Sequence, residues 1–152
     1  MRAIVQRVKY SSVEFIKEDA KIKNEINQGF QVLLGITHDD TDKDLDYIVD
    51  KITGLRVFED ENQKLNLSIE DISGEILLVS QFTLYGDARK GKRPSFTDAA
   101  RPEIAIPLYE SAIEKIKAKG INCQTGEFGA DMQVTIVNDG PVTIMLDSKK
   151  QF

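Results

Sequence analysis

Polar residues interrupt the longest strand signal of the chain, at a point where the strand is expected to continue. Residues 75–85 have the sequence EILLVSQFTLY, in which Ser80, Gln81 and Thr83 break an otherwise apolar run. Alternate residues of a strand face opposite sides, so one solvent-facing side would explain Ser80 or Gln81 but not both. A strand end that delivers backbone amides and a hydroxyl to a pocket explains both. Such a site can hydrolyse an ester by holding its carbonyl against preorganised amides.

The side chains that usually perform hydrolysis are scarce in this sequence. His38 is the sole histidine, and its acidic surroundings before an expected helix favour a surface or capping role over a place in a Ser-His-Asp triad. Cys123 is the sole cysteine and has no neighbours that would lower its pKa. One histidine and one cysteine, far apart in the chain, do not indicate a metal site. The sequence therefore shows no obvious general base.

A Gly-Pro pair near the C-terminus separates two apolar runs, 132–137 and 142–146. Gly140 has access to backbone angles closed to other residues, while Pro141 fixes its own φ and has no amide donor. Taken alone, the sequence NDGPVTI favours an ordinary hairpin turn. The alternative is a backbone clamp that presents carbonyl oxygens to a ligand.

Positive charge is concentrated in one stretch of an acidic protein. The net charge is −5, which argues against nucleic-acid binding by the whole surface. Residues 89–93 nevertheless contain four basic side chains. Most such clusters are solvated loops, but a local patch can hold one end of an RNA without gripping its length.

Two helices and a set of short strands must position these features. Apolar residues at helical spacing predict a helix over 39–54, in which Thr41 followed by Asp44 resembles a capping box. A second helix is expected before Gly120, with Tyr109 on its apolar face. Alternating or continuous apolar runs predict the strands, listed here by residue number: 1–16 (one long bent strand or two), 21–26, 30–36, 55–58, 75–85, 132–137 and 142–146.

This order, roughly β-β-β-α-β-β-α-β-β, predicts an α+β fold with a mostly antiparallel or mixed, barrel-like sheet. The length of 152 residues predicts a single domain over 1–152. The lone cysteine suits a reducing cytoplasm, and no run is long and apolar enough for a membrane span or a secretory signal. The glycines form neither a phosphate loop nor a dinucleotide-binding fingerprint.

The sequence resembles the D-aminoacyl-tRNA deacylases through essentially the whole chain. The resemblance is carried by MRAIVQRV at the start, LRVFEDE at 55–61, SQFTL at 80–84, KGKRPSF at 90–96, FGADM at 128–132 and NDGPVT at 138–143. SQFTL and NDGPVT are the two signature motifs of that family. The resemblance implies a carboxylic ester hydrolase that removes D-amino acids from tRNA, and glycine from tRNA-Ala, with no metal or organic cofactor.

By resemblance, the active protein is a homodimer with its sites at the subunit interface. The Gly140–Pro141 bond would be cis and enter the partner's pocket, within a chirality filter that also includes Asn138 and Thr143. Its carbonyl oxygens would hold the substrate's α-amino group and leave no room for an L side chain.

The resemblance also implies how the remaining site residues act. The 2′-hydroxyl of the terminal adenosine would help activate water, with the ester held at the catalytic segment formed by Ser80, Gln81, Phe82 and Thr83. The adenosine-binding wall would be Phe128, Gly129, Ala130 and Met132, and the tRNA phosphate contacts Lys90, Lys92 and Arg93. The 3′ end of aminoacyl-tRNA is the expected partner, with no membrane or DNA partner. Two alternatives stay open: a non-catalytic RNA-binding module, and a relative that deacylates L-alanyl-tRNA.

Overall fold

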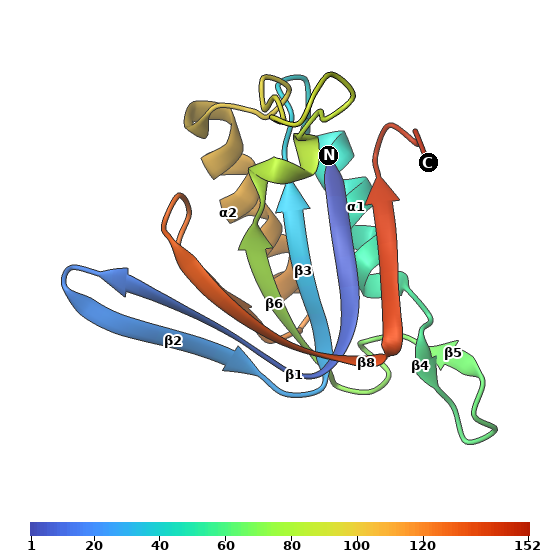
Figure 1. Cartoon of the computed structure of the whole chain (residues 1–152). Helices are drawn as coiled ribbons and strands as arrows, with labels where there is room; N and C mark the ends of the chain where they lie inside the picture. The colour runs from blue at the N-terminus through green and yellow to red at the C-terminus, as the bar shows by residue number, and fades with distance from the viewer.

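The computed structural model describes all residues, 1–152, and contains two α-helices, a 3₁₀ turn and eight strands (Figure 1). The fold is α+β with a mostly strand, barrel-like architecture, as the sequence predicts. The elements in chain order are β1 (Arg2–Lys17), β2 (Ala20–Ile26), β3 (Gly29–Gly35), α1 (Asp42–Gly54), β4 (Phe58–Glu59), β5 (Leu65–Leu67), β6 (Glu75–Ser80), the 3₁₀ turn η1 (Phe82–Tyr85), α2 (Pro102–Ala118), β7 (Cys123–Thr125) and β8 (Met132–Asp147).

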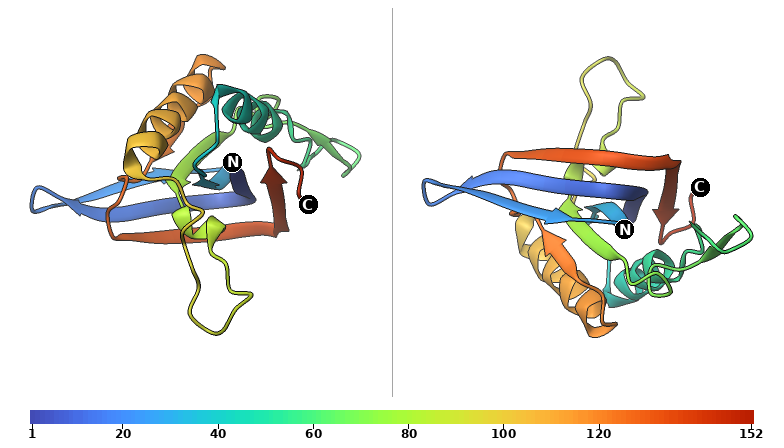
Figure 2. Two further views of the ribbon diagram at one scale, coloured as in Figure 1. Left: turned by 90° about the horizontal axis from the view of Figure 1, so that it is seen from above. Right: turned by 90° about the horizontal axis from the view of Figure 1, so that it is seen from below.

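Six strands form one mixed sheet, ordered β2-β1-β3-β6-β7, with β8 added on β1. β1 pairs antiparallel with β2, β3 and β8, whereas β3–β6 and β6–β7 are parallel. The curled sheet nearly closes on itself, and α1 and α2 cover one of its sides (Figures 1 and 2). β4 and β5 form a separate small hairpin.

The core lies between the sheet and the two helices. The predicted apolar stripe of α1 is buried through Leu45, Ile48, Val49 and Ile52, and it packs in one cluster with residues of β1, β3, β6 and α2. The expected capping box is present, because the Thr41 amide donates to the Asp44 carboxylate at 2.9 Å. Both helices therefore pack on the face of the sheet formed by β1, β3 and β6.

The strand expected over 75–85 is shorter than predicted. β6 ends at Ser80, and the chain then turns into η1 across the end of β3. Gly35, the last residue of β3, permits this crossing: a Cβ atom there would lie 2.9 Å from Cβ of Leu84 and 3.0 Å from the carbonyl oxygen of Gln81. Because β3 offers no further partner beyond Gly35, the second half of the apolar run has no ladder to join.

The hairpin turn expected at NDGPVT is wrong. β8 is one strand, and both of its halves pair antiparallel with β1 in the same direction. Asn138 pairs with Val8 and Thr143 with Gln6, so the four residues between Asn138 and Thr143 face a single residue of β1. The Gly-Pro pair therefore lies in an enlarged bulge, of four residues against one, within a continuous strand. The two predicted closing strands are one element, and β5 and β7 are additional to the predicted order.

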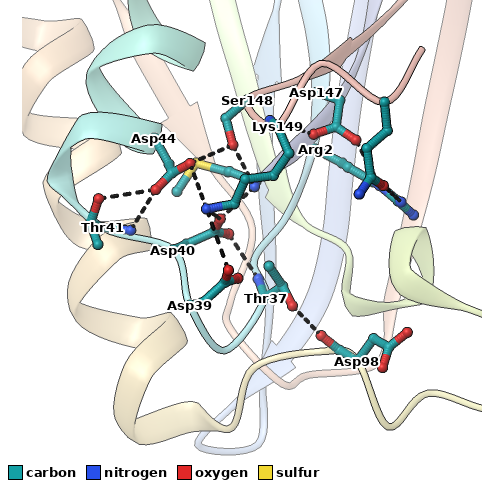
Figure 3. A network of polar contacts seen from close by, with 12 residues as sticks. Arg2, Thr37, Asp39, Asp40, Thr41, Asp44, Asp98, Asp147, Ser148 and Lys149 are labelled. Atoms are coloured by element: carbon teal, nitrogen blue, oxygen red, sulfur yellow. Dashed lines mark hydrogen bonds and ion pairs between the residues drawn. The ribbon is translucent and has the colours of Figure 1, made fainter.

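A buried polar network joins the start of β1, the start of α1 and the segment after β8 (Figure 3). The Met1 ammonium lies 2.5 Å from the Asp40 carboxylate and 2.8 Å from Oγ of Ser148, and Ser148 in turn donates to Asp44 at 2.7 Å. Arg2 extends the connection, since its guanidinium donates to the Leu84 carbonyl at 3.0 Å. The network thus reaches η1.

Candidate functional site: an apolar pocket at the end of β6

A pocket of about 290 Å³ opens at the end of the sheet where β3 and β6 stop. Most of its lining is apolar, and the polar groups come from the end of β6. Seven of the residues expected at the site from the sequence line this pocket: Ser80, Gln81, Phe82, Phe128, Gly129, Ala130 and Met132. A mostly apolar cavity with a few convergent polar groups is the usual form of a small-molecule site.

The two hydroxyls of the SQFTL motif lie in different surroundings. Ser80 ends β6 and lines the pocket, whereas Thr83 is exposed and does not line it. The Gln81 side-chain amide donates to Oγ1 of Thr83 in a short contact. This is the side-chain hydrogen bond that Thr83 makes, and it involves no histidine, lysine or carboxylate, so no base is hydrogen-bonded to this hydroxyl.

The backbone supplies the donors that these side chains lack. The first amides of a helical turn have no acceptor within it. Among the backbone hydrogen bonds of turns and loops, neither Phe82 nor Thr83 donates, whereas Gln81 donates to Leu34 at 2.8 Å and Leu84 to Gln81 at 3.2 Å. The amides of Phe82 and Thr83 are therefore free at the strand end. Such donors suit a developing oxyanion.

The pocket residue Phe128 packs against a residue that the sequence did not single out for the site. Phe128 lies with its ring centroid 6.0 Å from that of Tyr109 on α2. The Tyr109 hydroxyl donates to the carbonyl of Leu78 at 2.8 Å, and burial raises the pKa of Tyr109. Tyr109 was predicted only as part of a helix face. It ties α2, β6 and the pocket wall together.

The Gly140–Pro141 peptide bond is cis, and both residues are exposed. The flanking polar residues brace the bulge that carries them. The Asn138 side chain accepts from the Val142 amide at 3.2 Å and donates to Oγ1 of Thr143 at 3.1 Å. The structure thus brings Asn138 and Thr143 together as supports of the bend.

Arg7 is the residue of this bend that sequence reasoning missed. It is buried, and its guanidinium donates to the carbonyls of Val57, at 2.7 Å, and Asp139, at 3.2 Å. A Cβ atom on Gly140, whose φ is +119°, would lie 2.9 Å from the same guanidinium. A charged residue at an inward position of an alternating strand was the available signal, because arginine is seldom buried without partners.

Within one chain, the Gly-Pro bend and the pocket are at opposite ends of the sheet. Asn138 pairs with Val8, Val8 with Gly29 and Gly29 with Glu75, which is the first residue of β6. Ser80 is the last residue of β6, about 16 Å farther along the strand direction. Figure 1 shows the bend of β8 beside β4 and β5, away from η1.

The basic cluster lies on a loop that leaves the molecule after η1 and returns before α2 (Figure 2). Arg89 is held by Asp87 through contacts of 2.8 and 2.7 Å, and this arginine lowers the pKa of Asp87 to about 2. The three other cations of the loop are exposed and form no ion pair: Lys90, Lys92 and Arg93. Their positive charge is therefore available to an anion.

The other candidate catalysts occupy structural positions. His38 is exposed and its Nε2 lies 2.8 Å from the carbonyl of Thr97, in keeping with the predicted surface role. Cys123 is buried in β7, and burial raises its thiol pKa to about 11. No three His, Cys, Asp or Glu side chains gather closely enough to hold a metal ion. Neither helix has the length and apolar character needed to cross a bilayer.

The fold and site define a small α+β protein with an apolar pocket, free backbone amides at a strand end and no adjacent side-chain base. A family model described as D-Tyr-tRNA(Tyr) deacylase matches residues 4–147. The chain belongs to this family.

Individual relatives agree with this membership over their full length. The D-aminoacyl-tRNA deacylase of Clostridioides difficile is 59% identical over 152 residues, covering 100% of both chains. That of Koribacter versatilis is 57% identical over the same length. Among solved structures, the "c-Myc DNA Unwinding Element Binding Protein" is 45% identical, with a TM-score of 0.87 over 97% of this chain and 98% of its own. A "probable eukaryotic D-amino acid tRNA deacylase" is 19% identical with a TM-score of 0.80 over 96% and 98%, and supports the fold.

Proposed function

We propose that this protein hydrolyses the ester bond of D-aminoacyl-tRNA, releasing the amino acid and the free tRNA. The observation that carries the proposal is the meeting of two motifs in one pocket. Ser80 and Phe82 of SQFTL line the same pocket as Phe128 and Met132 of FGADM, in a chain 59% identical to a relative named for this activity. The SQFTL residues hold the ester, while Phe128 and Met132 take the adenine ring of the terminal nucleotide, with Gly129 and Ala130.

The chemistry is carried by backbone and RNA. A water molecule, activated by the 2′-hydroxyl of the terminal adenosine, adds its oxygen to the ester carbonyl. The amides of Phe82 and Thr83 hold the oxyanion, and the bond to the ribose oxygen then breaks as that oxygen takes up a proton. Ser80 and Gln81 shape the pocket around the ester. The free amides at this strand end and the absence of a base beside Thr83 support this route.

Two copies of the chain form the complete site. The bend carrying Gly140 and Pro141 lies at the far end of the sheet from its own pocket, so it would act on the pocket of a partner. The free edge of β8 and its exposed Val137 and Met145, 46% and 55% accessible, support pairing of this surface with a second copy. In the dimer, the carbonyl oxygens of the bend bind the substrate's α-amino group.

This arrangement selects by exclusion. An L side chain would collide with the bend that holds the amino group, whereas a D side chain points outward and glycine has none. Many D-amino acids, and glycine on tRNA-Ala, are therefore substrates. Lys90, Lys92 and Arg93 contact phosphates of the acceptor end, and the reaction takes place in the cytoplasm, where aminoacyl-tRNA is used.

One assay separates the proposal from its alternatives. Purified protein is incubated with matched D- and L-aminoacyl-tRNAs, and loss of the ester is followed. Cleavage of D-tyrosyl- but not L-tyrosyl-tRNA is expected. Cleavage of L-alanyl-tRNA would indicate the related L-specific activity. Cleavage of none would indicate a non-catalytic RNA-binding module, an alternative that the basic loop favours and that fits the nucleic-acid binding named for the 45% identical structure.

The RNA-assisted step has its own test. A D-aminoacyl-tRNA whose terminal 2′-hydroxyl is replaced by hydrogen, with the amino acid on the 3′ oxygen, should bind but not be turned over. Turnover at the rate of the normal substrate would show that the RNA hydroxyl takes no part.

A further inference from the structure

Two exposed aromatic rings meet at the mouth of the pocket. Phe82 is 58% and Phe96 39% accessible, and their ring centroids are 5.3 Å apart with an interplanar angle of 76°. Phe82 also lines the pocket, so the pair extends the apolar surface from the pocket outward. Large exposed aromatic surfaces of this kind mark binding sites more often than scattered single residues do.

The Phe96 ring is held in position by the base of its loop. Asp87 and Ser95 pair across the loop through two backbone hydrogen bonds of 2.8 and 2.9 Å. The ring lies directly over Gly86, where a Cβ atom would approach Cε1 of Phe96 to 2.9 Å. The Ala99 amide also donates to the Phe96 carbonyl at 3.1 Å. A ring that is already ordered loses little conformational freedom when a ligand stacks on it.

Unpaired cations follow within the same loop. Lys90, Lys92 and Arg93 lie three to six residues before Phe96, whereas Arg89 is neutralised by Asp87. Exposed aromatic rings next to a run of free cations are the combination with which proteins bind single-stranded nucleic acid, because the rings stack on bases while the cations track the backbone. The positive charge of these side chains complements the phosphates of RNA.

We infer that Phe82 and Phe96 form a base-stacking subsite for the nucleotide that precedes the terminal adenosine of the RNA 3′ end. This inference rests on the proposed function, in which the pocket takes the aminoacylated adenosine against Phe128. The next nucleotide is covalently adjacent and must leave through the pocket mouth. Phe82 belongs to both the pocket and the aromatic pair, so the base of that nucleotide meets the pair first.

The test compares a short and a long substrate. Phe96→Ala should lower kcat/KM for D-aminoacyl-tRNA at least about fivefold, the lower range for removal of a stacking ring. It should leave the cleavage of 3′-D-aminoacyl-adenosine, which lacks the preceding nucleotide, unchanged. Phe96→Tyr should restore tRNA cleavage, and Phe96→Leu, which keeps apolar volume without a π face, should not. Leu65→Ala, which removes an exposed apolar side chain of β5, is the matched control and should leave both substrates unaffected.

An abasic residue at the penultimate position gives the reciprocal change. With this abasic substrate, kcat/KM of the wild-type protein should fall by the same factor as kcat/KM of Phe96→Ala falls with normal tRNA. Phe96→Ala acting on the abasic substrate should show no further decrease in kcat/KM. Equal losses on the short and long substrates, or a full Phe96→Ala loss on the abasic substrate, would overturn the subsite.

Direct binding keeps the inference separable from the proposed function. Binding of a non-aminoacylated RNA oligonucleotide ending in CCA is measured by fluorescence anisotropy for wild type and Phe96→Ala. If wild-type protein cleaves no aminoacyl-tRNA but binds this probe in a Phe96-dependent way, the proposed function fails and the stacking subsite stands. Binding that does not depend on Phe96 would overturn the subsite even if D-aminoacyl-tRNA is cleaved.

Discussion

The guanidinium of Arg7 on β1 donates to the carbonyl of Asp139 at 3.2 Å, directly before Gly140. The same side chain lies 3.4 Å from the Asp139 carboxylate and also donates to the Val57 carbonyl, at 2.7 Å. One buried side chain thus fixes the bulge of β8 against both β1 and the segment before β4. The position of the bend depends on this fork of donors, which lysine does not reproduce.

Replacing Arg7 should loosen the bend. Arg7→Ala leaves two carbonyls without their donor and should lower the free energy of unfolding by about 2–3 kcal/mol. Arg7→Lys should fold but reduce cleavage of D-aminoacyl-tRNA more than it reduces tRNA binding. Urea denaturation and initial rates measure both effects. The control is Lys9→Ala, because Lys9 is exposed and lies 3.8 Å from Asp139, and it should change stability by less than about 1 kcal/mol.

Thr83→Ala should retain deacylation within about tenfold of wild type, because the amides and the RNA carry the chemistry and the hydroxyl has no base beside it. Single-turnover rates with D-aminoacyl-tRNA check this. A loss of more than about 10³-fold with fold and tRNA affinity intact, the scale of a dedicated catalytic group, would assign the chemistry to the side chain.

The free cations of the loop should govern the salt dependence of tRNA binding. Each of Lys92→Ala and Arg93→Ala should weaken binding and reduce the slope of log K against log salt by about one, since each removes one phosphate contact. The double variant Asp87→Asn/Arg89→Gln removes one charge of each sign from an existing ion pair and should leave the slope unchanged. Single-residue variants that leave the slope unchanged would place the RNA elsewhere.

Asp44 should contribute stability that depends on pH. Burial acts to raise its pKa, but hydrogen bonds from Ser148 and Thr41 together with Lys149 hold it well below the ordinary value (Figure 3). A carboxyl whose pKa is lowered by folding stabilises the folded state at pH values above its unfolded-state pKa of about 3.9. This stabilisation is lost as the pH falls through the folded-state pKa. Asp44→Asn should therefore cost about 1–2 kcal/mol at pH 7.

Denaturation of both proteins across pH checks this prediction, since the gap between wild type and Asp44→Asn should shrink below about pH 4. Asp42→Asn, in the same helical turn, is the control and should lower the free energy of unfolding at pH 7 less than Asp44→Asn does. A gap that persists undiminished at pH 2 would contradict the role assigned to the charge.

Cys123 should behave as an inert core thiol. Its pKa of about 11 lies above that of an unfolded thiol, so its contribution to stability is full below about pH 8.5 and is lost as pH rises toward 11. The folded protein should resist iodoacetamide at pH 8 and react once unfolded. Cys123→Ala should therefore lack the part of the decrease in unfolding free energy above about pH 8.5 that the wild-type thiol causes. Rapid labelling of the folded protein would contradict this.

The local elements followed from the sequence because their signals are local. The stripe of Leu45, Ile48, Val49 and Ile52 defined α1 together with its Thr41 cap, and alternation defined β1. The polar residues from Ser80 onward predicted a strand end, and β6 does end at Ser80, although the turn into η1 was not predicted. That turn depends on where the neighbouring β3 ends, at Gly35, which no window around Ser80 contains.

The sequence alone determined the two helices, the mixed sheet, the SQFTL and NDGPVT motifs and the lack of a conventional catalyst. The tertiary structure decided what these motifs adjoin. It brought Ser80 and Phe128 into one pocket, made 132–147 a single strand instead of a hairpin, and placed the Gly-Pro bend at the far end of the sheet from that pocket. These relationships come from strand register and from buried partners such as Arg7. Register is fixed by pairing between residues distant in the chain, so a local pattern does not encode it.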